Sequence, residues 1–112
     1  MRPTRVYIAG PITHGSQFDH VRVAIQTADL LWKEGFSPLV PHLTCFFHML
    51  CPHPAQDWYE YDNQWLDLCD CLLRLPGLST GSDAEVARML KQGKPVFYSL
   101  EEICSKMPKV IE

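Results

Sequence analysis

The fold is decided by residues 71–98, which read CLLRLPGLSTGSDAEVARMLKQGKPVFY. The apolar run at 71–75 ends at a Pro-Gly pair, which is typical of a strand that enters a loop. A helix is expected over 81–92, with Gly93 as its C-terminal cap. A second apolar run follows at 95–98. Strand, helix and strand in this order predict a βαβ unit with parallel strands.

The same alternation extends toward both ends of the chain. Apolar periodicity and turn residues predict a strand at 5–9, a helix from an Asp19 cap to Gly35, a strand at 36–40, short helices at 44–50 and after a Ser99–Glu102 capping box, a helix at 58–69, and a fifth strand at 108–112. We therefore expect one α/β domain over residues 1–112. Its flavodoxin-like (Rossmann-like) parallel sheet has four or five strands in the order 2-1-3-4(-5), with helices on both faces.

Composition excludes several classes of protein. The 112 residues carry a net charge of −3, so the basic footprint of a protein that binds a nucleic acid polymer is absent. No apolar run approaches the ~20 residues that span a bilayer, and no signal peptide precedes the first strand. The five cysteines are odd in number and are expected to be reduced thiols. A cytoplasmic protein without a membrane partner is the expectation.

In such sheets a ligand binds beyond the carboxyl ends of the strands, where the strand order reverses. The loop at 10–18 and the loop at 76–83 should face each other there. Four segments with residues that can carry chemistry are expected at this end: residues 7–13, Asp62 with Trp65 and Leu66, residues 79–82, and Glu85.

The chain resembles the nucleoside 2-deoxyribosyltransferase superfamily, which includes 2'-deoxynucleoside 5'-phosphate N-hydrolases. The resemblance is carried by Tyr7-Ile8-Ala9-Gly10-Pro11, by Asp62 ahead of Asp70, by Glu85-Val86-Ala87 and by Gly93-Lys94-Pro95-Val96. The order and the spacing of these motifs match, and residues 41–57 are unmatched. Among its members, small bacterial and phage proteins with Leu-Pro-Gly before the Ser/Gly loop are the most similar.

The resemblance implies roles for both carboxylates. Glu85 is the expected nucleophile at C1' of the sugar, and a place in the first turn of its helix would favour the ionised form. Asp62 is the expected partner that contacts or protonates the leaving base. The alternatives are that Glu85 only stabilises its helix and that Asp62 is a solvated residue near a helix start. Asp70 is expected to have a structural role.

Further residues are expected to bind the substrate. A serine at position 79, where the transferases have aspartate, suits a 5'-phosphate, and Gly81 and Ser82 extend this loop at a helix N-terminus. Ser82 is an alternative holder of that role, and a plain turn with Ser82 or Asp83 as N-cap is another interpretation. The other candidates are Gly10, Pro11 and Ile12 in the first loop, Tyr7 in the sugar pocket or the core, and His42 after the second strand.

A metal site is the weaker interpretation of His42, Cys45, His48 and Cys51, because their regular three-residue spacing does not match known zinc signatures. We expect no metal and no cofactor.

The predicted reaction is hydrolysis of the N-glycosidic bond of a (deoxy)nucleoside 5'-monophosphate. Base exchange by a deoxyribosyltransferase, a non-catalytic nucleotide sensor and a zinc-stabilised interaction protein are the alternatives. Its partner is a small nucleoside or nucleotide, and exposed aromatic residues favour a homodimer or larger assembly.

Overall fold

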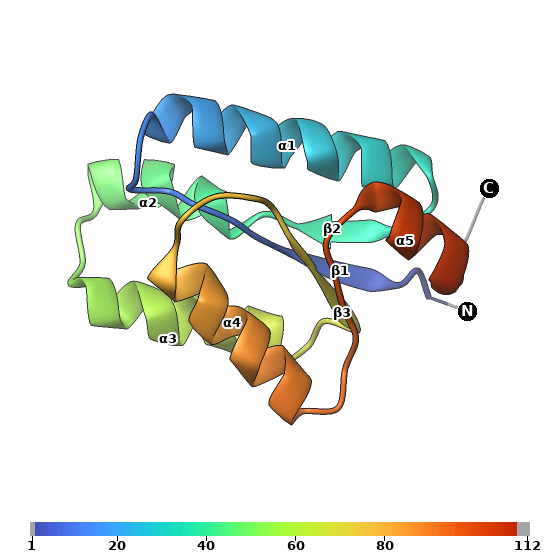
Figure 1. Cartoon of the computed structure of the whole chain (residues 1–112). Helices are drawn as coiled ribbons and strands as arrows, with labels where there is room; N and C mark the ends of the chain where they lie inside the picture. The colour runs from blue at the N-terminus through green and yellow to red at the C-terminus, as the bar shows by residue number, and fades with distance from the viewer. Residues whose placement is uncertain (1, 110–112) are drawn as a thin grey trace.

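The sheet has four parallel strands in the order β2-β1-β3-β4, in a computed structural model that describes residues 2–109 (Figure 1). The strands are β1 (Arg5–Ala9), β2 (Ser37–Leu39), β3 (Cys71–Arg74) and β4 (Val96–Phe97). This confirms the predicted α/β class and the strand order. The expected fifth strand at 108–112 falls largely outside the described residues, and 108 and 109 belong to no strand.

Helices cover both faces of the sheet, as predicted (Figure 1). They are α1 (Gln17–Lys33), the 3₁₀ turn η1 (Pro41–Leu43), α2 (Thr44–Leu50), α3 (Ala55–Leu66), α4 (Thr80–Lys91) and α5 (Leu100–Lys106). α1 and α5 lie on one face and α3 and α4 on the other, while η1 and α2 follow β2. No helix among residues 2–109 has the length and apolar character needed to span a bilayer.

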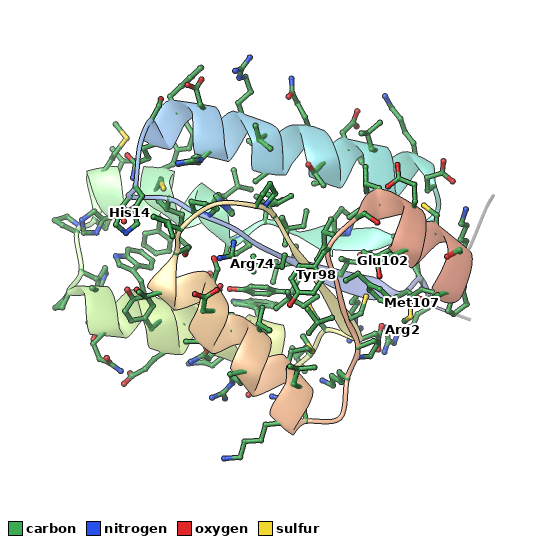
Figure 2. The ribbon with its side chains drawn as sticks, in the orientation of Figure 1. Arg2, His14, Arg74, Tyr98, Glu102 and Met107 are labelled. Carbon is green, nitrogen blue, oxygen red and sulfur yellow. The ribbon has the colours of Figure 1, made fainter. Side chains whose placement is uncertain are left out.

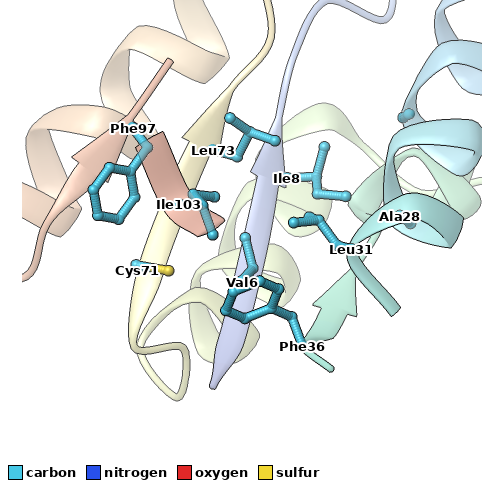
Figure 3. Close-up of a cluster of buried hydrophobic side chains, with 10 residues drawn as sticks. Val6, Ile8, Ala28, Leu31, Phe36, Cys71, Leu73, Phe97 and Ile103 are labelled. Atoms are coloured by element: carbon cyan, nitrogen blue, oxygen red, sulfur yellow. The ribbon is translucent and has the colours of Figure 1, made fainter. Parts of the chain in front are cut away.

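Two apolar cores result from the alternation of side chains along the central strands. On the α1 and α5 face, Ile8 and Leu73 pack with Leu31 and Ile103 (Figure 3). On the other face, Tyr7, Ala9 and Leu72 of the strands pack with Leu66 of α3 and Met89 of α4. Truncating one of the fully buried leucines to alanine typically costs about 2–5 kcal/mol. The central strands are therefore a firm platform for the loops at their carboxyl ends.

Three helix starts differ from the prediction. α1 begins at Gln17, because the Ser16 hydroxyl caps the helix by accepting the Asp19 N–H at 3.3 Å. α3 begins at Ala55 rather than at residue 58. The prediction missed this first turn because Ala55, Gln56 and Asp57 show no apolar periodicity. The N-cap of α4 is Ser79, neither Ser82 nor Asp83. For α1 and α4, the start of the helix is set by a serine that accepts a hydrogen bond from a free N–H of the first turn, and apolar periodicity does not reveal which serine does so.

The predicted capping box of α5 forms in a modified way. The Ser99 hydroxyl accepts the Glu102 N–H at 3.2 Å. The Glu102 carboxylate accepts the N–H of Tyr98 at 3.1 Å, one residue before the position that the motif prescribes.

Candidate active site

A cavity of about 510 Å³ lies at the carboxyl ends of the strands, as the strand order predicts. It is bounded by the loop after β1, by η1 and α2, by α3 and by the start of α4. Eight of the ten predicted site residues line it: Gly10, Ile12, His42, Asp62, Ser79, Gly81, Ser82 and Glu85. Segments far apart in the sequence thus meet around one space large enough for a small molecule.

Glu85 is the sixth residue of α4 and so lies in its second turn, not in the first turn as expected. The effect of the helix dipole fades within the first turn, so it gives this carboxylate little support. Burial raises the pKa of Glu85 to about 7. The charge of Asp62 also raises it, while the Tyr7 hydroxyl and the charge of Arg74 lower it. Glu85 is therefore poised between its two protonation states near neutral pH.

Asp62 projects from α3 into the same cavity. It is partly buried, and no ion pair or hydrogen bond of its side chain occurs among residues 2–109. Burial raises the pKa of Asp62 to about 7. The charge of Asp62 raises the pKa of Glu85, so the two carboxyl groups titrate as an interacting pair near neutral pH. Such a pair can supply an acid and an ionised nucleophile at once.

Tyr7 and Pro11, which were predicted to bind substrate, do not line the cavity. Tyr7 is fully buried on the α3 and α4 side of β1, and its hydroxyl donates a hydrogen bond to Glu85 Oε2. Burial, and to a smaller extent the charges of Glu85 and Asp62, raise the pKa of Tyr7, so the phenol stays protonated. Pro11 is buried against Gly77 of the facing loop, with φ of +118° at that glycine; an added Cβ there would lie 2.6 Å from Pro11 Cγ. Tyr7 positions the carboxylate, and Pro11 holds two loops together.

His42 lies in η1 and is 1% exposed, yet it contributes to the lining of the cavity. Neither of its ring nitrogens has a hydrogen-bond partner among the described residues. Burial lowers the pKa of His42 to about 4, so the imidazole is neutral. Its Nε2 lies close to Gly10, 3.5 Å from the place where a Cβ would stand. The nearest polar neighbours of the ring are the backbone groups of Gly10 and Pro11, which oppose the fall of its pKa, so His42 is a buried polar ring with at most weak partners.

Ser79 is committed to the start of α4. Its hydroxyl accepts the Ser82 N–H at 3.0 Å and lies 2.9 Å from the Ser82 hydroxyl. The N–H groups of Thr80 and Gly81 are in the first turn, where a helix offers no carbonyl partner. The Ser79 hydroxyl is thus used within the first turn of α4, and residues 79–82 together line this side of the cavity.

Sequence reasoning missed Arg74, which ends β3 beside the loop that leads into α4 (Figure 2). Its side chain is only 10% exposed; the guanidinium donates to the carbonyls of Leu75 and Gly77 and contacts Asp83 at 3.0 Å. The alternation of strand residues places it on the same face as Tyr7 and Leu72. A charged residue at the end of an apolar strand is the signal that could have identified it.

Sequence reasoning also missed the aromatic wall of the cavity, because it assigned the exposed aromatic residues to a subunit interface. Trp58 and Tyr59 of α3 line the cavity, together with His48 of α2. His48 accepts a hydrogen bond from the indole N–H of Trp58. Over residues 2–109 no group of three or more His, Cys, Asp or Glu side chains is arranged to hold a metal ion.

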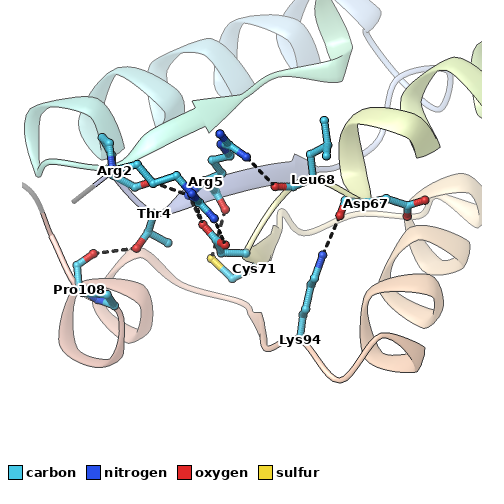
Figure 4. Close-up of polar contacts among 10 residues, drawn as sticks. Arg2, Thr4, Arg5, Asp67, Leu68, Cys71, Lys94 and Pro108 are labelled. Carbon is cyan, nitrogen blue, oxygen red and sulfur yellow. Dashed lines mark hydrogen bonds and ion pairs between the residues drawn. The ribbon is translucent and has the colours of Figure 1, made fainter.

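Asp70 has the expected structural role. Its carboxylate accepts two hydrogen bonds from Arg2 at 2.7 Å each and one from the Arg5 N–H at 2.8 Å (Figure 4). These contacts lie at the amino end of the sheet, opposite the cavity.

No protein-family model and no curated protein matches the chain. Among solved structures, the chain is similar to a 2-desoxiribosyltransferase from Leishmania mexicana, with a TM-score of 0.64 and 19% sequence identity. The match covers 84% of this chain and 62% of the other, so the chain spans less than two thirds of that protein's length. The parallel sheet, its strand order and this match together show that the chain has a nucleoside 2-deoxyribosyltransferase-like fold.

Proposed function

We propose that the chain is an enzyme that cleaves the N-glycosidic bond of a (deoxy)nucleoside 5'-monophosphate. The proposal rests on the pair of carboxyl groups, Glu85 and Asp62, which line one cavity and form no ion pair with any of residues 2–109. Carboxyl groups kept half-protonated by burial are characteristic of sites for acid–base and glycosyl chemistry. The nucleoside 2-deoxyribosyltransferase-like fold supports a sugar bound to a base as the substrate.

The two groups divide the reaction between them. The ionised Glu85 attacks C1' of the sugar, and the bond from C1' to the base nitrogen breaks. The protonated Asp62 gives its proton to the departing base. Water then attacks C1', Asp62 takes a proton from it, and the ester to Glu85 breaks. The products are the free base and the sugar phosphate. Tyr7 keeps the Glu85 carboxylate oriented through its hydrogen bond.

The 5'-phosphate is assigned to the start of α4. The free N–H groups of Thr80 and Gly81 and the positive end of the helix dipole favour an anion there. Ser79 keeps that turn in shape by capping it, and no carboxylate in the loop from 76 to 82 would repel a phosphate. His42, neutral and without a partner, is the proposed contact to a polar atom of the ligand.

Base exchange is the second candidate, because the solved protein of similar fold is named a 2-desoxiribosyltransferase. In that reaction a second base, rather than water, attacks C1' of the sugar held on Glu85. The same residues serve both reactions, and only the acceptor differs.

The test is release of free base from a panel of nucleosides and 5'-monophosphates, read by chromatography, with and without an added acceptor base. We expect the wild-type chain to release base from monophosphates. Glu85→Gln should abolish release, while Glu101→Gln, which changes an exposed carboxylate of α5, should not alter it. Release that requires the acceptor base would identify a transferase.

No release from any compound, together with nucleotide binding, would contradict the enzyme and favour a sensor. Equal release by Glu85→Gln and the wild type would refute the assigned nucleophile.

A further inference from the structure

His48 is held in a defined orientation by its neighbours. Its Nδ1 atom lies 2.8 Å from the indole Nε1 of Trp58 and 3.2 Å from the backbone nitrogen of His53. The rings of His48 and Trp58 meet edge to face, with centroids 5.8 Å apart. Both residues line the cavity that contains Glu85 and Asp62.

These contacts determine which nitrogen of His48 carries the proton. An indole N–H and a backbone N–H can only donate, so Nδ1 must accept and cannot itself be protonated. The neutral ring therefore has its hydrogen on Nε2. Nε2 has no hydrogen-bond partner among residues 2–109. His48 thus offers one free donor of fixed identity on the wall of the cavity.

We propose that His48 is a specificity-determining residue, which recognises a base carrying a hydrogen-bond acceptor on its edge by donating from Nε2. The inference rests on the proposed function, because it takes the ligand to be a nucleotide. The acceptor is a ring nitrogen or a carbonyl oxygen of a heteroaromatic base. An exocyclic amino group in that place, which can only donate, is disfavoured.

The surroundings of His48 favour the base over the other parts of a nucleotide. Trp58 and Tyr59 supply flat aromatic surfaces, and stacking of a base on such a ring is worth about 1–3 kcal/mol. The proposed anion site lies at the start of α4, where Gly81 borders the ring of Tyr59, so Trp58 is the aromatic surface next to His48. The carboxyl groups of Asp62 and Glu85 line the same cavity, and the bond to the sugar would lie beside them in the proposed reaction.

The first arm of the test measures the tautomer without any activity. In a ¹⁵N-labelled chain, the ring nitrogens of His48 should show a protonated Nε2 and an unprotonated Nδ1. Trp58→Phe removes the shorter of the two donor contacts to Nδ1 and should let the other tautomer appear in part, because the His53 N–H remains. A protonated Nδ1 in the wild-type chain would overturn the inference.

The second arm measures binding to the Glu85→Gln chain, which keeps the cavity but is not expected to turn over. The four common nucleoside 5'-monophosphates are titrated, with ribose 5-phosphate as the ligand that lacks a base. For the tightest monophosphate, His48→Phe should raise Kd about tenfold, the loss expected for one hydrogen bond. His48→Gln, whose amide can still donate, should recover most of the affinity. Ribose 5-phosphate should bind equally to all variants.

An unchanged Kd in His48→Phe, or an equal loss for ribose 5-phosphate, contradicts the role of His48. Base release by the wild type together with either result would refute this inference and leave the proposed function intact. Binding that depends on His48, without base release, would refute the reaction alone. No binding of any monophosphate would refute both.

Discussion

The pKa of a carboxyl group is shifted in opposite directions at the two ends of the sheet. At the amino end, Asp67 accepts hydrogen bonds from Arg88 at 2.7 and 2.8 Å and from Gln92 at 2.6 Å. These contacts, the Arg88 bond above all, lower the pKa of Asp67 to about 2. Lys94 binds the Asp67 carbonyl close by (Figure 4). At the carboxyl end, burial raises the pKa of Asp62 to about 7, and no cation in the described part of the chain pairs with it.

Asp62 and Asp67 are five residues apart on or next to one helix, and the difference lies in their partners. A paired, exposed carboxylate contributes to stability and stays ionised over the whole physiological range. A buried carboxyl group without a cation costs stability but can exchange a proton near neutral pH. The contrast distinguishes structural acids from candidate catalytic acids within one short protein.

The largest expected effect concerns the rate of base release. Asp62→Asn removes the proton donor for the leaving base and should lower kcat about 10²- to 10⁴-fold. Asp67→Asn, the matched change at the other end of the sheet, should leave kcat within about twofold. Steady-state kinetics on the best substrate checks this. Equal losses in the two variants would remove the functional distinction.

The next effect concerns the hydrogen bond from Tyr7 to Glu85, which lowers the pKa of Glu85. Tyr7→Phe should therefore raise that pKa. Because attack requires ionised Glu85, the acidic limb of the kcat/KM profile should move to higher pH. The rate near pH 6 should fall about tenfold, since a hydrogen bond to a charged group is worth about 1.5–3 kcal/mol. An unshifted acidic limb would contradict the role of Tyr7.

Arg74 provides a third test, because its positive charge also lowers the pKa of Glu85. Arg74→Met should raise the pKa of Glu85 and release the loop that Arg74 holds through Leu75 and Gly77. Arg74→Lys, which keeps the charge, should shift the pKa less. Titration of the Glu85 carboxyl carbon by NMR follows both variants. An identical Glu85 titration in wild type and Arg74→Met would exclude the electrostatic effect.

As pH rises, ionisation of Asp62 should lower the free energy of unfolding, whereas ionisation of Asp67 should raise it. Because the pKa of Asp62 rises on folding, the wild type should lose stability as pH rises from about 4 to about 7. Asp62→Asn should therefore stabilise the protein at pH 8, by about 1–2 kcal/mol after allowance for its partial exposure, and change little at pH 4. Urea unfolding at both pH values measures this. A destabilised Asp62→Asn chain at pH 8 would be the contrary result.

The smallest effect concerns Asp67, whose pKa falls on folding. Its contribution is present above about pH 4 and is lost as pH falls toward 2. Asp67→Asn should cost about 0.5–1 kcal/mol at pH 7, the usual worth of a partly exposed ion pair. The same urea experiment reports it. A cost at pH 7 that also persists at pH 2 would show that the ion pair is not its source.

Local pattern was enough to predict the order of strands and helices, the parallel sheet and the end of the sheet where the cavity lies. Periodicity and turn residues report which side of an element is buried, and alternation of strand and helix leaves few topologies. Glu85 and Asp62 could be named because the motifs around them resemble those of the nucleoside 2-deoxyribosyltransferase superfamily. The exact helix starts escaped this reasoning, since Ser16 and Ser79 act through single cap bonds.

The sequence by itself determined the fold class and which carboxylates are candidates for chemistry. Only the tertiary structure decided that Tyr7 reaches Glu85, that His42 is buried without a partner and that Trp58 orients His48. The tertiary structure also raises the pKa of both Asp62 and Glu85, because a pKa depends on burial and on charges brought together from distant positions. Such contacts join residues up to 78 positions apart, and no local pattern encodes them.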